Sequence, residues 1–201
     1  MKKSDFIVII PARKNSKRLK EKNTMILSGK PLICYSIEYA LLYFLKENIW
    51  INTNDEKVER VANSYDIQIY KRKDSLATDK TSTVEVIEDQ IVYMESKKVN
   101  FTDIIILQPT NPFRNNLNLN KILKLYKSKK LNSLMTVSTT NLKLGTINNK
   151  LFKPLNYSFH QRSQDMDELY FENGQLYICN KQIIKDSKTI ISSDVYPHIC
   201  E

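Results

Sequence analysis

The chain has few glycines and few cysteines, and it lacks long apolar runs. Its three glycines, Gly29, Gly145 and Gly174, leave every other turn to non-glycine residues. The three cysteines lie far apart and have no histidine at metal-ligand spacing, which argues against a disulfide framework and a zinc site. No segment approaches the ~18 consecutive apolar residues that a membrane-spanning helix needs. The apolar run at 6–10 is too short for a secretion signal, so we expect a cytoplasmic protein that does not enter a membrane.

Basic residues are in excess. Lys and Arg total 31 against 22 Asp and Glu, which gives a net charge of +9. A Lys-rich solvated surface accounts for such an excess, and so does a phosphate-rich ligand. A nucleic acid is disfavoured as a partner, because no compact RNA- or DNA-binding motif is found. The length of 201 residues and the 41% apolar content suit a single domain, 1–201, with a buried core.

Short apolar runs alternate with helical periodicity, which is typical of an α/β protein with a doubly wound, mostly parallel sheet. The expected strands are 6–10, 49–52, 67–70, 104–107, 134–138 and 175–179. One helix is expected to begin near Pro31, which suits a first helical turn. The other expected helices are 56–65, with Asp55 as its N-cap, 83–97, 117–127 and 181–186. Residues 141–172 have poor periodicity, so we expect a small hairpin arm that leaves the sheet.

The first expected strand ends in a basic loop. Pro11 closes the apolar run, and the loop that follows holds six cations, namely Arg13, Lys14, Lys17, Arg18, Lys20 and Lys22. Ligands of open α/β sheets bind at the carboxyl ends of the strands. Cations and backbone N–H groups at that edge would offset the charge of a polyphosphate. The alternative is a solvated basic turn.

This loop and four later segments, taken in order, resemble one enzyme family. The segments are 10–23, 51–56, 72–82, 107–114 and 161–177. Together they resemble the cytidylyltransferases that activate nine-carbon keto acids, best known as CMP-N-acetylneuraminate (CMP-sialic acid) synthetases. The resemblance spans nearly the whole chain. It implies a nucleotide-diphospho-sugar transferase-like fold and a homodimer that uses the arm at 141–172.

The resemblance implies an activity and a nucleotide site. CMP would pass from CTP to the anomeric hydroxyl of a nonulosonic acid, releasing pyrophosphate and giving a CMP-sugar for surface glycans such as lipopolysaccharide or capsule. Arg13 and Lys22 would act as the catalytic residues by holding the triphosphate, while Arg72 and the Ala77 backbone would read cytosine. The other implied nucleotide-binding residues are Ala12, Ser16, Lys17, Asn23 and Ser82. Asn15 stands where the family has glycine, and Asn tolerates the left-handed backbone that glycine provides.

A second set of residues is implied for the keto acid. The set is Gln108, Thr110, Arg162, Gln164, Tyr170, Asn173 and Tyr177. Arginine suits the acceptor's carboxylate, although Ser163 takes the place of the second arginine of the family's pair. Thr110 stands where the synthetases for the eight-carbon acid KDO carry a metal-binding Asp, which favours the sialic-acid-like branch. The pair Asn173-Gly174 is also compatible with a simple turn.

The resemblance implies Mg²⁺ as the cofactor. The family binds it through an Asp-x-Asp pair beyond the segment that matches 195–200, and this chain ends at Glu201, short of that pair. Its metal ligands are therefore unknown, with Asp55 and Asp79 as the candidates that remain.

Three alternative functions stay open: a cytidylyltransferase for KDO-like or other acidic sugars, a non-catalytic CTP-binding relative or fragment, and a basic nucleic-acid binder. The sequence does not choose among sialic, legionaminic and pseudaminic acids.

Overall fold

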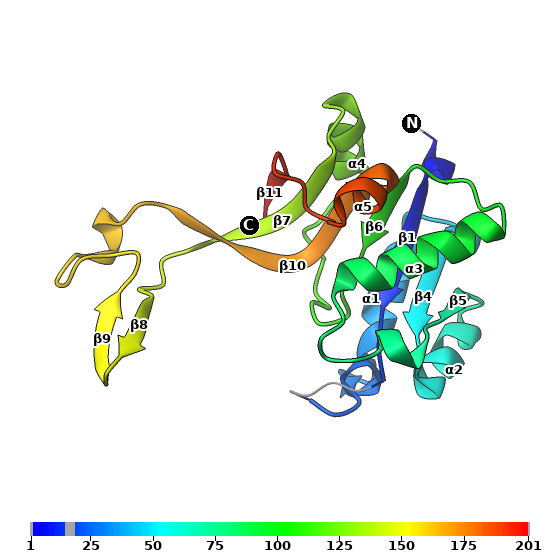
Figure 1. The fold of residues 1–201 in the computed structure, drawn as a ribbon, viewed down its shortest axis with the longest axis horizontal. Helices are drawn as coiled ribbons and strands as arrows, with labels where there is room; N and C mark the ends of the chain where they lie inside the picture. Colours follow the sequence, from blue (N-terminus) through cyan, green and yellow to red (C-terminus); the bar gives the residue numbers. More distant parts are fainter. Residues whose placement is uncertain (1, 15–18, 201) are drawn as a thin grey trace.

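The fold is a mixed seven-stranded sheet with helices on both faces and one long arm (Figure 1). The structure, a computed structural model, describes residues 2–14 and 19–200. In the order in which they lie in the sheet, the strands are β11 (Tyr196–Cys200), β7 (Ser133–Thr140), β10 (Leu169–Asn180), β6 (Asp103–Ile106), β1 (Phe6–Pro11), β4 (Ile49–Thr53) and β5 (Gln68–Lys71). The helices are α1 (Leu32–Leu41), α2 (Glu56–Ser64), α3 (Thr83–Ser96), α4 (Leu119–Ser128) and α5 (Lys181–Ser187).

The strand order confirms the doubly wound, mostly parallel sheet. β1 pairs in parallel with β4 on one side and with β6 on the other, and β4 pairs in parallel with β5. The chain therefore builds outward from β1 in one direction and later returns to build in the other. Such a reversal is a topological switch point, where open α/β sheets bind ligands. β10 is antiparallel to both of its neighbours, and β11 is parallel to β7.

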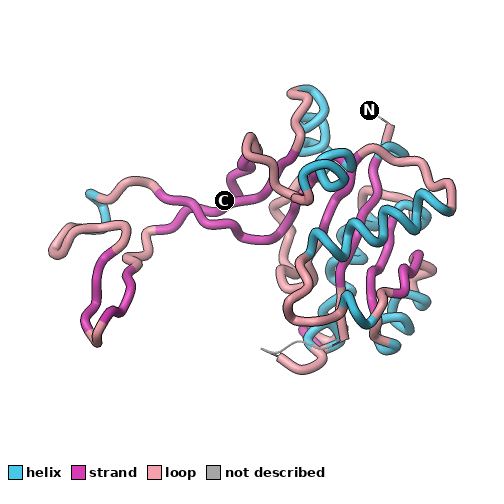
Figure 2. Tube along the Cα trace, in the orientation of Figure 1, coloured by secondary structure: helices cyan, strands magenta, loops and turns pink. Residues whose placement is uncertain are grey.

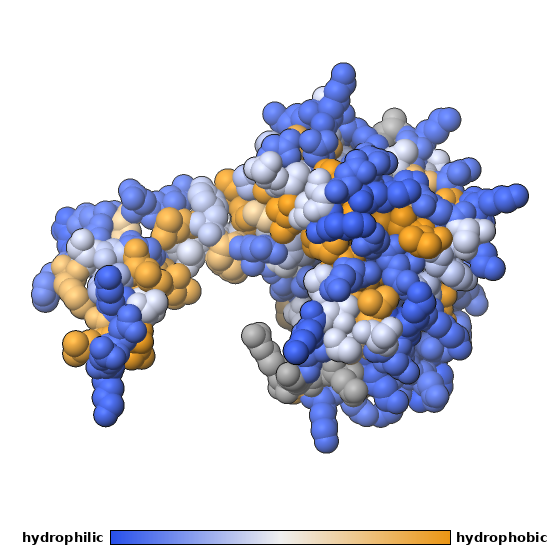
Figure 3. All heavy atoms as spheres, viewed as in Figure 1, coloured by the Kyte–Doolittle hydropathy of each residue, from blue (hydrophilic) through white to orange (hydrophobic). Residues whose placement is uncertain are grey.

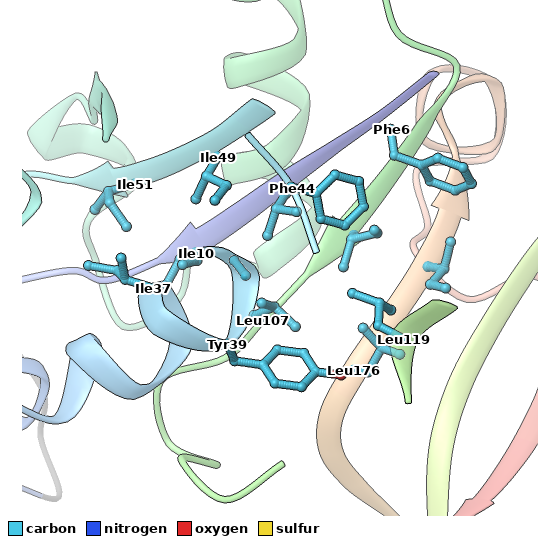
Figure 4. Close-up of a cluster of buried hydrophobic side chains, with 14 of the residues drawn as sticks. Phe6, Ile10, Ile37, Tyr39, Phe44, Ile49, Ile51, Leu107, Leu119 and Leu176 are labelled. Carbon is cyan, nitrogen blue, oxygen red and sulfur yellow. The ribbon is translucent and has the colours of Figure 1, made fainter. Parts of the chain in front are cut away.

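Two apolar layers form the core, one on each face of the sheet. Alternate residues of β1 point to opposite faces, because successive side chains of a strand alternate. Phe6, Val8 and Ile10 pack with α1, α2 and α4 (Figure 4). Ile7 and Ile9 pack on the other face with α3 and α5. All five side chains are buried, so the core on both faces of the sheet holds β1, and with it the start of the loop that follows β1, in place.

The helix ends show where sequence reasoning was right and where it was wrong. Asp55 caps α2 as expected, since its carboxylate accepts a hydrogen bond from the Lys57 amide over 2.9 Å. Pro31 is not in the first helical turn; it pairs with Ile26 in the small hairpin of β2 (Ile26–Leu27) and β3 (Lys30–Pro31). The fourth helix begins at Leu119 instead of Leu117, because the Asn118 side chain caps it.

The predicted arm is present. β7 and β10 leave the body side by side and lead to a hairpin of β8 (Gly145–Asn148) and β9 (Leu151–Pro154) (Figure 2). The two long strands extend further than expected, to 140 and from 169. Asn173-Gly174 is not a simple turn, because both residues lie inside β10 where its register with β7 shifts. A β-bulge of this kind re-aims the strand.

The structure also shows the state of the cysteines and the character of the helices. All three cysteines are free thiols, and Cys34 and Cys179 are buried. Burial raises the pKa of the Cys179 thiol to about 12, which makes it an unreactive core residue. Among the described residues, no helix combines the length and apolarity that crossing a bilayer requires.

Candidate functional site

A pocket of about 250 Å³ opens at the carboxyl ends of β1, β5 and β6. It lies at the switch point between β1 and β6 and includes the carboxyl end of β1, where the sequence predicted a ligand site. The segments that line it are the end of β1 and the loop after it, the residue after β5, the turn before α3, the first turn of α3 and the segment after β6. The lining residues are Pro11, Arg13, Lys22, Asn23, Arg72, Asp79, Thr81, Ser82, Thr83, Val86, Gln108, Pro109 and Thr110. Seven predicted site residues therefore meet in one place.

Arg13 is held at the rim of this pocket by Thr78 and Asp79, which lie beside it in space. Its guanidinium donates to the Thr78 carbonyl over 2.8 Å and pairs with the Asp79 carboxylate at 2.8 Å. The buried Asn23 donates from Nδ2 to the Arg13 carbonyl over 3.0 Å, which ties the two ends of the basic loop together. Asp79 thus offsets part of the positive charge that the loop brings to the pocket.

The described end of the basic loop has the backbone shape that glycine usually supplies. Glu21 has a φ of 52°, in the left-handed region that glycine adopts most easily. A short 3₁₀ turn, Lys22–Thr24, follows, so Lys22 enters the pocket wall directly after this bend. The Glu21 side chain pairs with Lys57 of α2 at 2.6 Å, away from the lining residues. Asn15, Ser16, Lys17 and Arg18 lie outside the described residues.

Arg72 is a buried cation at the pocket wall. Only 8% of its surface is exposed, and among the described residues no carboxylate pairs with it. Its Nε and Nη2 donate to the side chain and the backbone oxygen of Asn52, over 2.6 and 3.0 Å. Burial, with the charge of nearby Arg13, lowers the pKa of Arg72 to about 10, so the guanidinium is still charged at neutral pH. A buried charge without a counter-ion favours an electron-rich ligand.

The first turn of α3 closes the same pocket. Ser82 accepts a hydrogen bond from the Glu85 amide over 3.2 Å, and the Glu85 carboxylate accepts one from the Ser82 amide over 2.7 Å. This capping box sets where the 14-residue helix begins. The positive end of the helix dipole then lies at the pocket, which adds to the attraction for an anion.

The segment after β6 meets the bulge of β10. Gly174 has a φ of 68°, and a side-chain carbon there would lie 3.5 Å from Gln108 Oε1 and 3.2 Å from Asn111 Nδ2. Asn111 donates to the Asn173 carbonyl across the same contact. Because glycine allows both the backbone angle and this close approach, Gly174 holds β10 against the Gln108 side of the pocket.

The predicted keto-acid residues are only partly brought together. Gln108 and Thr110 line the pocket. Asn173 uses its side-chain amide on β7, accepting from Thr136 over 2.6 Å and donating to Ser138 over 2.9 Å. The Tyr177 hydroxyl donates to Glu172. Both residues therefore frame the bulge beside the pocket without lining it.

Three predicted residues lie on the arm, away from the lining of this pocket. Arg162 makes a two-point ion pair with Asp165, at 2.7 and 3.1 Å, within the arm. Tyr170 donates to Glu168 over 2.7 Å, and Gln164 is exposed in a short turn. Figure 1 shows this part of the chain projecting far from the body. Within one chain, then, the arm residues do not join the pocket.

Two of the predicted nucleotide-binding residues, Ala12 and Ala77, are not among the lining residues and lie in segments next to them. Ala12 is buried, and its amide donates to the Asn52 carbonyl over 2.9 Å, which continues the β1–β4 pairing. Ala77 ends the 3₁₀ turn Asp74–Leu76 with its amide bonded to the Asp74 carbonyl. Both hold backbone that leads into the lining residues.

Sequence reasoning missed three residues. Arg114 is 2% exposed and donates to the carbonyls of Gln175 and Gln108, each over 2.7 Å. Asn52 and Gln90 are fully buried behind Arg72. The signal for Gln90 was available, since it is a polar residue on the apolar face of α3, four residues after Val86 and four before Met94.

No resident metal cage appears among the described residues. They contain no group of three or more His, Cys, Asp or Glu side chains able to share an ion. Asp55 is committed to capping α2 and does not line the pocket. Asp79 does line it, but a single carboxylate that already pairs with Arg13 does not make a Mg²⁺ site by itself.

Comparison with known proteins agrees with this geometry. The model of the Cytidylyltransferase family matches residues 7–197. An N-acylneuraminate cytidylyltransferase of Escherichia coli is 33% identical over 187 residues, which are 90% of this chain and 43% of that protein. A CMP-N,N'-diacetyllegionaminic acid synthase of Legionella pneumophila is 30% identical over 198 residues, 96% of this chain and 85% of that protein.

Among solved structures, a CMP:2-keto-3-deoxy-manno-octonic acid synthetase complexed with CTP superposes with a TM-score of 0.70 at 17% identity. The match covers 97% of this chain and 89% of that one, and it supports the fold alone. The chain spans less than half of the curated N-acylneuraminate cytidylyltransferases of Escherichia coli and Streptococcus agalactiae, 43% and 47% of their lengths. With the family model covering nearly all of its length, the chain belongs to the cytidylyltransferase family.

Proposed function

We propose that this chain binds CTP in the pocket at the β1–β6 switch point and transfers its CMP to a nonulosonic acid. The observation that carries the proposal is the convergence of Arg13, Lys22 and Arg72 on one pocket, where Asp79 is the single carboxylate among the described lining residues. A triphosphate and a base edge rich in acceptors suit that charge balance.

The residues divide the work by position. Arg13 and Lys22 would hold the β- and γ-phosphates and neutralise the leaving pyrophosphate, because both follow the strand end at which the phosphates would lie. Arg72 would donate to the O2 and N3 acceptors of cytosine. The anomeric hydroxyl of the acceptor would attack the α-phosphorus, and the protein's main contribution is to align the two substrates.

Mg²⁺ remains part of the proposal as a cation that accompanies the nucleotide. When bound, it would supply positive charge at the phosphate oxygens, and Asp79 is the one carboxylate that the described part of the chain brings to the pocket. No step of the reaction is assigned to it here, because the described residues do not form its site.

The acceptor would lie beside Gln108, against the bulge of β10. Gln108 and Thr110 supply neutral hydrogen-bonding groups there, which suit hydroxyl and amide substituents of a sugar. The relatives named above use N-acylneuraminic and legionaminic acids, and we extend that substrate class to this chain. Its product would feed surface glycan synthesis in the cytoplasm, where CTP is available. A panel that includes KDO separates this proposal from an acidic-sugar enzyme of another branch.

A homodimer built through the arm completes the proposal. Ile147, Leu151 and Phe152 of the hairpin are 76%, 73% and 46% exposed, which is unusual for large apolar side chains on so thin an element. Figure 3 shows apolar side chains gathered over β8 and β9. A second copy of the chain would cover this surface, and would bring its Arg162 and Tyr170 toward a pocket that they do not reach within one chain.

The decisive experiment is thermal unfolding with Mg²⁺ and each of CTP, UTP, ATP and GTP. A ligand at about 100 times its Kd stabilises a protein by about 2.7 kcal/mol, which is readily measured. We expect a shift that is selective for CTP, followed by pyrophosphate release when a nonulosonic acid is added. A selective shift without pyrophosphate release would indicate a non-catalytic CTP-binding protein. The proposal fails if no nucleotide shifts the transition.

A further inference from the structure

Three polar side chains form a continuous line from the core to the pocket wall. Gln90 of α3 accepts a hydrogen bond at Oε1 from Asn52 Nδ2 over 2.8 Å. Asn52 of β4 in turn accepts at Oδ1 from Arg72 Nε over 2.6 Å. Gln90 and Asn52 are fully buried, and of the three only Arg72 lines the pocket.

The chemistry of arginine fixes the direction of the whole line. A guanidinium only donates, so the Asn52 atom that faces Arg72 must be the carbonyl oxygen. The amide nitrogen of Asn52 must then face the other way, toward acceptors, and it meets Gln90 Oε1 and, at a longer 3.4 Å, the Val86 carbonyl. Gln90 therefore has to present oxygen, not nitrogen, to Asn52.

This direction leaves a buried donor without a partner. Gln90 Nε2 is inaccessible and has no hydrogen-bond partner in the described part of the chain. An unsatisfied buried donor is unfavourable, and the neighbours of Gln90 on the same helix face, Val86, Ile91 and Met94, are apolar. What Gln90 supplies in return is the acceptor that holds Asn52, and through it Arg72, in one orientation.

We propose that Gln90 and Asn52 are positioning residues that set nucleobase selectivity by orienting the Arg72 guanidinium. The proposal rests on the function proposed above. Nη1 of Arg72 has no protein partner among the described residues, so it is available to a ligand at the pocket wall. Cytosine offers acceptors at O2 and N3, whereas uracil carries a hydrogen on N3. A correctly turned guanidinium can therefore distinguish CTP from UTP.

The first test replaces Gln90 with methionine, which has a similar shape but no acceptor oxygen. Titration calorimetry would give the affinities of wild type and Gln90→Met for CTP, UTP and inorganic triphosphate. We expect the ratio of CTP to UTP affinity to fall about tenfold, the value of one hydrogen bond to a charged group, with triphosphate affinity unchanged. The matched control is Ile91→Val, which trims the buried neighbour and leaves the line intact.

The second test reverses the direction of the line. In Asn52→Asp the carboxylate still accepts from Arg72, and Gln90 can turn to donate its unpartnered Nε2 to the other oxygen. In Gln90→Glu the new carboxylate still accepts from Asn52. We expect each single variant to keep the preference for CTP, because a hydrogen bond still joins residues 52 and 90, whereas Gln90→Leu, which offers Asn52 no acceptor, should lose it. This test also decides the case if Gln90→Met does not fold.

The outcomes separate the two proposals. If wild type shows no preference for CTP, the proposed function fails before the variants are considered. If wild type prefers CTP and Gln90→Met keeps the same ratio of CTP to UTP affinity, the positioning role is wrong and the line serves only stability. An equal loss of affinity for triphosphate and for both nucleotides would also overturn it, since that pattern reports a general collapse of the pocket.

Discussion

Arg114 donates a hydrogen bond from Nη2 to the backbone oxygen of Gln108 over 2.7 Å. The same guanidinium donates from Nε to the Gln175 carbonyl over 2.7 Å and from Nη1 to Ser36 Oγ over 3.1 Å. One buried side chain thus joins the segment after β6 to β10 and to α1. Burial lowers the pKa of Arg114 to about 10, which leaves it charged at neutral pH.

Replacing Arg114 with methionine is expected to destabilise the fold. The substitution leaves buried carbonyl oxygens at 108 and 175 without a donor, which costs about 2–4 kcal/mol in the free energy of unfolding. Arg114→Lys keeps the charge but not the forked donors, so we expect an intermediate loss. Urea unfolding of the three proteins measures this. A loss below about 1 kcal/mol for Arg114→Met would show that water replaces the guanidinium.

Replacing Lys22 with alanine is expected to weaken the binding of CTP and of inorganic triphosphate together. Lys22 lines the pocket and would contact phosphate, so the loss should be about tenfold or more and should not depend on the base. CTP turnover should fall sharply as well. Lys20→Ala is the matched control, because Lys20 is an exposed cation of the same loop that does not line the pocket. Unchanged CTP turnover in Lys22→Ala would remove Lys22 from the site.

Asp89 on α3 is expected to stabilise the folded chain at neutral pH and to lose this contribution at acidic pH. Burial alone would raise the pKa of its carboxyl, but hydrogen bonds from Lys73 and Tyr70 outweigh this and lower it below the ordinary value of 3.8. A carboxyl with a lowered folded pKa stabilises the protein above its unfolded pKa, and this contribution is lost as the pH falls through the folded value. Asp89→Asn should therefore be less stable than wild type at pH 7.

The same pair of proteins provides the pH test. The difference in unfolding free energy between Asp89→Asn and wild type should be about 1 kcal/mol at pH 7 and should shrink steadily below about pH 4. Urea unfolding at pH 7, 5 and 3 measures it. A difference that stays constant across that range would mean that the Asp89 carboxyl does not titrate differently in the folded and unfolded chain.

A charge placed on the hairpin is expected to dissociate the proposed homodimer without unfolding the chain. Ile147→Lys and Leu151→Lys change side chains that are 76% and 73% exposed within one chain, so the folded monomer should tolerate them. Leu42→Lys is the matched control, since Leu42 is 75% exposed at the end of α1, away from the arm. Sedimentation should show monomers for the two hairpin variants only. A monomeric wild type would refute the dimer directly.

Local patterns were enough to predict most of the scaffold. The apolar run of β1 and the stripe on α3 have periods that are fixed by backbone geometry, and Asp55 caps its helix through an interaction with a residue two positions away. The order of the motifs placed Arg13, Arg72 and Gln108 at strand ends, and parallel strands bring their carboxyl ends to one edge. These predictions were right because each depends on neighbours in sequence or on sheet direction alone.

Contacts between distant segments decided the rest. Whether Asn173-Gly174 is a turn or a bulge depends on how β10 meets β7 and Asn111. The roles of Arg114 and Gln90 depend on partners 61 and 38 residues away in the chain. The sequence by itself determined six of the seven strands of the main sheet, the helices and the cations of the pocket, because periodicity and charge are local properties; the edge strand β11 was not predicted. Only the tertiary structure decided how those cations are oriented and which predicted residues stay on the arm, because buried hydrogen bonds are made between elements that the sequence leaves far apart.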